Sequence, residues 1–249
     1  MLTARSCMTG LMLSLCALAC SADTLKYAIV SSQTLPLADI TPVNGHYQVD
    51  TEKGFLILLG KEISAALNME LKTSVLPRPD LVKALPEGQV DMVCYQTPAW
   101  TKDIADKVDW TEPFMGSKDI LVSKSKTPDL ENIDDLKGKT IGLIKHYSYP
   151  LIDHLIESKD INPVYSLSEA SNFIQLFKNP NLDAIVLKEL TYEWLSLEQT
   201  SLVSNTHIKI HPLVIELIEP RCVLSRHKNL DLNKINQAIG LFKSKYGFD

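Results

Sequence analysis

The sequence predicts an α/β protein with mainly parallel β-sheets. Short runs typical of strands alternate along the chain with amphipathic segments of helical period. The 249 residues are 45% apolar and 22% charged, which is enough apolar material for a sizeable core and typical of a globular chain. Because no repeat or low-complexity stretch interrupts this pattern, coiled coils, collagen and wholly disordered chains are excluded.

The expected strands share β-branched or alternating apolar residues. They lie at residues 24–30, 71–76, 90–95, 119–123, 140–144, 164–165, 182–187 and 206–211. The expected helices share an apolar stripe or a start signal such as Pro150 or Ser168. They lie at residues 56–69, 80–85, 149–158, 168–177 and 232–246. A polar, proline-containing loop is expected after the first strand, and a helix or turn at residues 129–136.

The first 22 residues have the features of a secretory signal peptide. Arg5 gives the start a positive charge, and the apolar run GLMLSLCALA that follows is too short to span a bilayer. Small Ala22 precedes polar Asp23, so residues 1–22 are expected to be cleaved and the mature chain to be periplasmic. The alternative is a lipobox in which Cys20 is acylated.

Two of the five cysteines, Cys94 and Cys222, remain in the mature chain. In an oxidising compartment they are expected to form a disulfide; the alternative is two separately buried thiols. Neither has a zinc-like spacing to another Cys or His. His207 and His211 are about 13 Å apart on an extended strand, too far to share a metal, and are expected to face solvent. No metal and no cofactor are therefore expected.

The charge and the motifs of the chain exclude further classes of function. Lys and Arg number 25 against 30 Asp and Glu, a net charge of -5 without a basic run, so no nucleic-acid partner is expected. The chain has no nucleophile elbow, Walker loop, zinc-protease or dinucleotide-binding motif. The acids Asp183, Glu189 and Glu193 are interpreted as loop and helix-surface residues, and no enzymatic activity is expected.

Several motifs, in order, resemble one family. Gly54-Phe55 precedes a helix, Ala84-Leu85 is followed by GQVD, and KVDWTEPF, DDLKGKTIG and NLDAIV follow at residues 107–114, 134–142 and 181–186. This order and spacing resemble periplasmic solute-binding proteins of the polar-amino-acid type, family 3, across essentially the whole mature chain.

The resemblance implies a two-lobed type II periplasmic binding protein fold, in which the chain crosses twice between α/β lobes and a hinge closes over a small ligand. Lobe 1 would comprise residues 23–116 and 219–249, and lobe 2 residues 117–218. The hinges would lie near residues 114–118 and 217–221. Cys94 and Cys222 would then both belong to lobe 1, where a disulfide would not tie the lobes together.

Two anchors of the family's amino-acid binders are changed here. Where the resemblance places a carboxylate-binding Arg, the turn reads QTPAWTKD, with Lys102 as the candidate replacement. Where it places an ammonium-binding Asp, the sequence has Lys188. Ordinary α-amino-acid recognition is therefore not expected.

Other residues are candidates for the cleft. Arg78, between two prolines, takes the place of a ligand-covering aromatic and suits an anion; its alternative is an exposed loop arginine. Tyr95 and Trp100 are expected on the first-lobe wall. At the second-lobe strand-to-helix turn, the candidates are His146, Tyr147 and Tyr149. The alternative for these aromatics is ordinary packing within a lobe.

The sequence therefore predicts an exported, monomeric protein that captures a small anionic or aromatic ligand for an ABC-type membrane permease. A ligand-sensing module for a membrane receptor and an exported dehydratase or lyase are the alternatives. A further alternative is a cleft that binds no small molecule and serves only as a contact surface for another protein.

Overall fold

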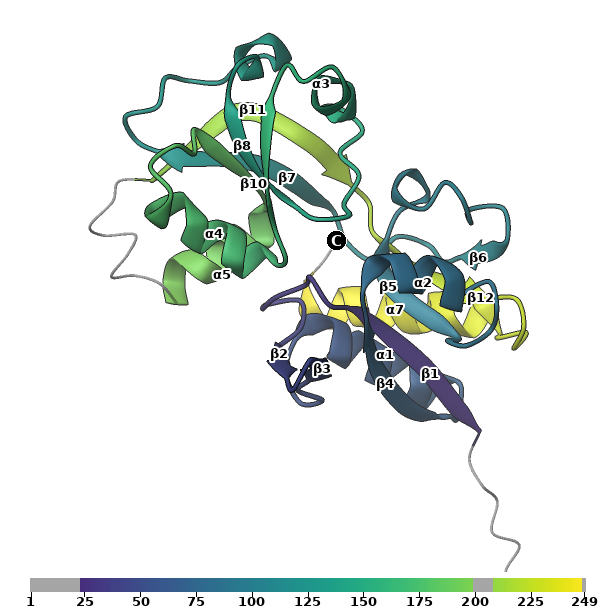
Figure 1. Cartoon of the computed structure of the whole chain (residues 1–249). Helices are drawn as coiled ribbons and strands as arrows, with labels where there is room; N and C mark the ends of the chain where they lie inside the picture. Colours follow the sequence, from purple (N-terminus) through teal and green to yellow (C-terminus); the bar gives the residue numbers. More distant parts are fainter. Residues whose placement is uncertain (1–22, 199–207, 248–249) are drawn as a thin grey trace, which may run out of the picture.

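A computed structural model describes residues 23–198 and 208–247, which form two five-stranded sheets and one hairpin (Figure 1). The first sheet has the order β4-β1-β5-β12-β6, with strands Glu70–Leu76, Thr24–Val30, Met92–Gln96, Arg221–Ser225 and Val108–Trp110. The second has the order β11-β7-β10-β8-β9, with strands Ile208–Ile218, Ser117–Lys124, Ala184–Lys188, Thr140–Ile144 and Asn162–Ser166. The hairpin pairs β2, Ile40–Val43, with β3, His46–Val49.

Helices cover both faces of each sheet, so each sheet has its own core. On the first sheet, α1 (Phe55–Ala66) and α7 (Leu232–Tyr246) pack on one face and α2 (Arg78–Ala84) on the other. On the second sheet, α3 (Asp153–Glu157) packs on one face and α4 (Glu169–Lys178) with α5 (Glu189–Glu198) on the other. The two sheets with their helices form the two separate bodies visible in Figure 1.

Both sheets are mixed, which corrects the expectation of mainly parallel sheets. β1 pairs in parallel with β4 and β5, whereas β12 runs antiparallel to β5 and β6. β8 pairs in parallel with β9 and β10, whereas β7 runs antiparallel to β10 and β11. The antiparallel β7–β11 pair arises because β7 enters the second sheet and β11 leaves it, so the two crossing strands run in opposite directions.

The two crossings between the sheets lie side by side. The chain leaves the first sheet after Trp110 and enters the second at Ser117, then leaves at Ile218 and returns at Arg221. The backbone N–H of Phe114 donates to the carbonyl of Pro220 at 3.1 Å. Because both segments are short and hydrogen-bonded together, the sheets are joined by a narrow double connection.

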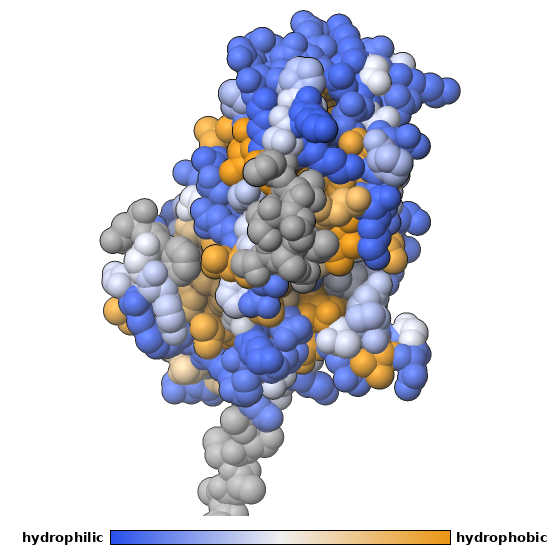
Figure 2. All heavy atoms as spheres, turned by 90° about the vertical axis from the view of Figure 1, so that its left-hand side faces the viewer, coloured by the Kyte–Doolittle hydropathy of each residue, from blue (hydrophilic) through white to orange (hydrophobic). Residues whose placement is uncertain are grey.

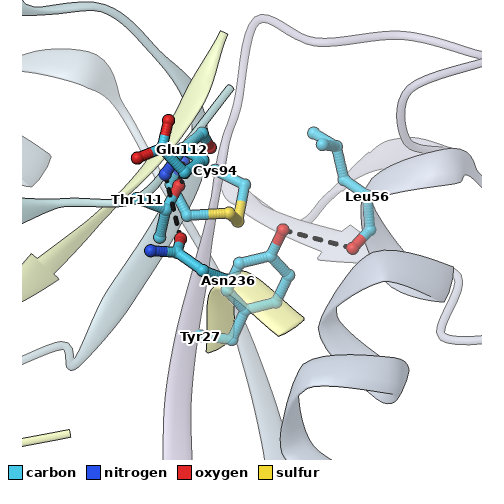
Figure 3. The surroundings of a disulfide bond; sticks show 7 residues. Tyr27, Leu56, Cys94, Thr111, Glu112 and Asn236 are labelled. Atoms are coloured by element: carbon cyan, nitrogen blue, oxygen red, sulfur yellow. Dashed lines mark hydrogen bonds between the residues drawn. A yellow bond between two sulfur atoms is a disulfide. The ribbon is translucent and has the colours of Figure 1, made fainter. Parts of the chain in front are cut away.

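A disulfide joins Cys94 of β5 to Cys222 of β12, as the sequence predicted (Figure 3). Both residues are buried, and the bond spans a sequence separation of 128. The N–H of Cys222 donates to the hydroxyl of Thr111 at 2.9 Å. Nearby, Tyr27 donates its hydroxyl hydrogen to the carbonyl of Leu56 at 3.1 Å, which ties β1 to α1. The bridge therefore links two strands of one sheet and leaves the second sheet free.

Two elements differ from the sequence prediction for local reasons. The segment expected to be a loop contains the β2–β3 hairpin, whose turn is Asn44 (φ 50°) and Gly45 (φ 80°). An Asn-Gly pair with positive φ at both positions is typical of a tight hairpin turn. The helix expected at residues 149–158 begins only at Asp153, because the Asp153 carboxylate accepts hydrogen bonds from Tyr149 N–H and Ser148 Oγ and holds the preceding turn.

Gly54 fixes the start of α1 beside the first loop. Its φ is 97°, and a Cβ there would lie 2.7 Å from both the Ala38 Cα and the Leu37 carbonyl oxygen. Only glycine combines this conformation with such a close approach. The Leu56 N–H then donates to the Leu37 carbonyl at 2.9 Å, which joins α1 to the loop after β1.

Hydrophilic and hydrophobic residues are unevenly distributed on one face of the molecule. On the face shown in Figure 2, hydrophilic residues predominate at both ends, and hydrophobic residues gather mainly around the middle. Within residues 23–198 and 208–247, no helix is both long enough and apolar enough to cross a bilayer. The expected signal peptide and Cys20 lie outside the described residues.

Candidate ligand-binding site

The candidate site lies where side chains from the two sheets meet, and Arg78 is at its centre. Arg78 begins α2, directly after β4, and is 8% exposed. Its Nη2 donates to the Trp100 carbonyl at 2.8 Å. Its guanidinium carbon lies 5.7 Å from the ring centroid of Trp100 and 5.3 Å from that of Tyr147. Burial lowers the pKa of Arg78 from its usual value, with nearby Tyr147 opposing this. Arg78 is thus a buried cation beside two aromatic rings, not an exposed loop arginine.

Trp100 and Tyr147 bring the two bodies into contact. Trp100 ends a single 3-10 turn, Pro98–Trp100, after β5, and Tyr147 follows β8. Their rings stack at 6.5 Å between centroids with an interplanar angle of 26°. The Trp100 Nε1–H donates to Glu216 of β11 at 2.9 Å, and the Ser32 hydroxyl donates to the Tyr147 hydroxyl at 3.0 Å. The aromatic pair therefore closes the space between the sheets beside Arg78.

Lys188, at the end of β10, forms the second buried cation of the site. It is 2% exposed and pairs with the carboxylate of Glu169, the equally buried first residue of α4. Its Nζ lies 4.8 Å from the ring centroid of Tyr147 and 5.5 Å from that of Tyr95. Burial lowers the pKa of Lys188, but the combined attraction of Glu169, Tyr147, Asp119 and Tyr95 outweighs burial and raises the pKa well above its usual value. Lys188 is therefore a charged ammonium whose partner is Glu169.

Asp119 adds an unusual carboxyl group beside this pair. It lies near the start of β7, is 4% exposed, and borders a narrow gap, too small to hold a water molecule, with Lys188, Tyr149 and Glu169. Burial raises its pKa to about 7, with Lys188 opposing and Glu169 reinforcing the rise. Asp119 Oδ1 and Glu169 Oε2 find no hydrogen-bond donor among the described residues. Buried acceptors of this kind are rare and mark a functional or strained region.

Tyr95 links the site to the hinge and to the disulfide. It follows Cys94 in β5, is 1% exposed, and its hydroxyl lies 2.8 Å from the Ser117 hydroxyl at the start of β7. Burial raises the pKa of Tyr95. The φ angles of Tyr95 and His146 are 63° and 67°, which lie in the left-handed region that non-glycine residues seldom adopt. Such conformations tend to cluster at functional sites, where the surrounding structure holds them in place.

Of the three remaining predicted residues, two lie apart from this centre and Tyr149 borders it. Lys102 and His146 are exposed, and neither forms a hydrogen bond or ion pair within the described part of the chain. Tyr149 is 2% exposed, and its hydroxyl accepts a hydrogen bond from the Ile144 N–H at 2.9 Å. Burial raises its pKa. Tyr149 therefore packs within the second body, with its ring 6.3 Å from that of Tyr147 between centroids, and borders the narrow gap beside Asp119.

The expectation that His211 faces solvent is wrong. His211 is 3% exposed, its Nδ1 accepts from the Leu130 N–H at 3.2 Å, and its Nε2 lies 2.8 Å from the Ser123 hydroxyl. Burial lowers its pKa. The reason is that the segment containing Leu130 covers β11, which the alternation of the strand alone did not predict. His207 lies outside the described residues.

Three acidic residues of the site were missed from the sequence: Asp119, Glu169 and Glu216. Asp119 sits just after the predicted hinge, which is the one signal that pointed to it. Glu169 follows the helix cap Ser168 and was indistinguishable from an ordinary first-turn acid. Within the described chain no group of three or more His, Cys, Asp or Glu side chains could hold a metal ion.

Comparison with known proteins agrees with this architecture. Residues 37–246 match the model of the bacterial extracellular solute-binding proteins, family 3, and the chain belongs to this family. A probable histidine-binding protein of Campylobacter jejuni is 28% identical over 124 residues, which cover 50% of this chain and 47% of that protein. The match thus spans about half the length of this curated relative.

Solved structures share the fold along nearly the whole chain. The substrate binding protein of an amino acid ABC transporter superimposes with a TM-score of 0.66 at 22% identity, covering 91% of this chain and 96% of that one. An ancestral arginine-binding protein bound to arginine gives a TM-score of 0.68 at 20% identity, covering 92% and 96%. These likenesses confirm the predicted two-lobed type II periplasmic binding protein fold.

Proposed function

We propose that this chain is an exported binding protein that captures a small anionic or aromatic solute between its lobes and delivers it to an ABC-type membrane permease. It would act by binding, without catalysis, as a monomer in the periplasm. Lobe 1 would comprise residues 23–116 and 219–249, and lobe 2 residues 117–218. Membership of the solute-binding family supports the general role.

The observation that carries the ligand class is the state of Arg78. Its guanidinium is buried, donates to one carbonyl, and forms no ion pair at contact distance among the described residues, although Glu216 attracts it from further away. Lys188, by contrast, is neutralised by Glu169. A buried cation without a counter-ion is costly unless an anion pairs with it. A carboxylate or phosphate accepting a two-pronged hydrogen bond from Arg78 would remove that cost.

The rings around Arg78 support an aromatic or planar ligand. Trp100 and Tyr147 both lie next to the guanidinium, and Tyr95 lies 6.3 Å from Trp100 between ring centroids. Aromatic side chains bind flat apolar groups over a large area. A basic ligand such as arginine would bring a further cation next to Arg78, so we propose that cationic amino acids are not the preferred solutes.

Direct contacts between the lobes support a hinge mechanism. Tyr95 contacts Ser117, and Trp100 contacts Glu216, across the boundary between the two bodies. The two crossings beside each other provide a narrow connection about which the lobes would turn. We propose that a ligand bound at Arg78 strengthens the closed arrangement, which the permease would recognise.

A thermal-shift screen of residues 23–249 tests this function. The panel contains benzoate, phenylacetate, dicarboxylates and phosphorylated metabolites, with arginine and histidine for comparison. A ligand at about 100 times its dissociation constant stabilises by about 2.7 kcal/mol, which raises the midpoint by a few degrees. We expect acids to give the shift and Arg78→Ala to remove it, while Arg226→Ala, an exposed control, retains it. A panel in which only arginine or histidine shifts the midpoint would refute the proposal.

A further inference from the structure

The ammonium group of Lys188 fills the space that its neighbours enclose. Its side chain is 2% exposed, and the gap that remains beside it is too small to hold a water molecule. Its Nζ donates to the carboxylate of Glu169 and lies 4.8 Å from the ring centroid of Tyr147 and 5.5 Å from that of Tyr95. Tyr95 belongs to the first sheet, whereas Glu169 and Tyr147 belong to the second body. The ammonium therefore lies where the two bodies meet.

The neighbours of this ammonium share an attraction for positive charge. Glu169 from α4 and Asp119 from β7 provide carboxyl groups, and Tyr147 and Tyr95 provide the faces of aromatic rings. Both kinds of group attract ammonium ions, and their effect on the pKa of Lys188 outweighs that of burial. Because these neighbours come from four separate parts of the chain, the tertiary fold builds a cation site, and a side chain of the protein itself occupies it.

This cation site lies close to the group that would bind the solute. The guanidinium carbon of Arg78 is 5.3 Å from the ring centroid of Tyr147, and Lys188 Nζ is 4.8 Å from the same centroid. The two cations are separated by no more than the sum of these distances, which a small solute can span. An ammonium group on a solute held at Arg78 would meet the like charge of Lys188 and would find Glu169 already paired. Burial strengthens the repulsion, because water screens it less.

We propose that Lys188 is a specificity-determining residue, whose ammonium occupies a cation site and thereby excludes solutes that carry an ammonium group beside their anionic group. This specificity rests on the proposed function and adds that the solute is an acid without an amino group. The occupied cation site itself does not depend on what binds at Arg78, so the two can be tested separately. An ion pair that only stabilises the fold would neither accept an external amine in place of Lys188 nor discriminate between solutes.

An external amine tests the cation site directly. Propylammonium has the same heavy atoms as the part of the side chain that Lys188→Ala removes. The thermal midpoint is measured in propylammonium chloride, in sodium chloride and in 1-propanol at equal concentrations. The proteins are the wild type, Lys188→Ala, Lys188→Ala/Glu169→Gln and Lys178→Ala. Lys178 is an exposed residue of α4 and is the matched control.

We expect propylammonium to raise the midpoint of Lys188→Ala by at least about 2 °C more than either comparison solution does. The wild type and Lys178→Ala should show no such gain, because Lys188 still fills the site. The double variant should lose most of the gain, because the main attraction comes from Glu169. An equal gain in the wild type or in the double variant, or no gain in folded Lys188→Ala, would overturn the assignment.

Two pairs of acids test the specificity. Phenylalanine differs from 3-phenylpropionate, and aspartate from succinate, only by an α-ammonium group. Isothermal titration gives their affinities for the wild type, Lys178→Ala and Lys188→Met, a variant that keeps most of the side-chain volume and serves also if Lys188→Ala does not fold. We expect the wild type and Lys178→Ala to prefer the acid without the ammonium by about tenfold or more. Lys188→Met should lose most of this preference.

The outcomes separate this inference from the proposed function. A wild type that binds the amino acid of a pair as well as the plain acid, or a preference that is unchanged in Lys188→Met, would overturn the specificity assigned to Lys188. If acids bind through Arg78 in either of these cases, the proposed function stands. If no acid binds, the proposed function and the specificity both fail, whereas a gain from propylammonium in Lys188→Ala would still support the occupied cation site.

Discussion

Asp119 makes the stability of this protein depend on pH. Its carboxyl group is 4% exposed at the start of β7, and burial raises its pKa from 3.8 to about 7. Lys188 opposes this rise, while Glu169 and Glu216 reinforce it. In the unfolded chain, water surrounds the same group, and its pKa returns to about 3.9.

The sign and size of the effect follow from the difference in proton binding. Between about pH 4 and pH 7 the folded protein holds a proton on Asp119 that the unfolded chain has lost. The stability associated with this group is therefore fully present below about pH 4 and is lost as the pH rises through about 7. A shift of about three pKa units corresponds to about 4 kcal/mol of unfolding free energy.

Asn at this position cannot titrate, so Asp119→Asn isolates the contribution. Urea unfolding is measured at a pH near 4 and again at a pH above 8, for the wild type, Asp119→Asn and the exposed control Asp103→Asn. Relative to the wild type, Asp119→Asn should be more stable at the higher pH by about 4 kcal/mol than it is at the lower pH. Asp103→Asn should show no such change. A constant difference between Asp119→Asn and the wild type at both pH values would refute the reasoning.

Three further sets of substitutions are expected to lower the stability of the protein by predictable amounts. Replacing Cys94 and Cys222 together by Ala releases a constraint across 128 residues and should lower the free energy of unfolding by about 5 kcal/mol in urea titrations; an equally stable variant would contradict this. Glu169→Gln leaves Lys188 buried without its partner and should lower the free energy of unfolding by about 3 to 5 kcal/mol. This loss should exceed that of the double variant Glu169→Leu/Lys188→Met, in which neither charge remains. A smaller loss than in the double variant would argue against a buried ion pair. Ser168→Ala removes the cap of α4 and should lower the thermal midpoint by the equivalent of about 1 kcal/mol, whereas an unchanged midpoint would count against the cap.

The fold could be predicted largely because its local patterns agree with its tertiary structure. The strands Thr24–Val30 and Thr140–Ile144 and the helix Leu232–Tyr246 have the bounds that their apolar periodicity predicted. Strand direction was harder to predict, because alternation of side chains is the same in parallel and antiparallel strands. The β2–β3 hairpin was missed although Asn44-Gly45 signalled its turn.

The candidate site was predicted in part. Five residues of the inner walls come together, as their positions in the order of the motifs suggested. They are Arg78, Tyr95, Trp100, Tyr147 and Lys188. Lys102 and His146 lie in exposed turns, where a shift of one residue reverses the direction of a side chain and the sequence gives no register.

The acids of the site required tertiary information. Glu169 lies 19 residues before Lys188 in the sequence, on a different element, and their pairing depends on how α4 packs against β10. Asp119 approaches the same place from β7. A single sequence contains no signal that three elements place these charges together.

The central claim is that Arg78 pairs with the anionic group of a ligand, and isothermal titration of one acid against two proteins tests it most directly. The acid that gives the largest thermal shift is titrated into the wild type and into Arg78→Ala. Truncating a buried, hydrogen-bonded charge typically costs 2 kcal/mol or more, so we expect the affinity to fall by about thirtyfold or more. Unchanged affinity in Arg78→Ala would contradict the claim and assign the binding energy to other residues of the cleft.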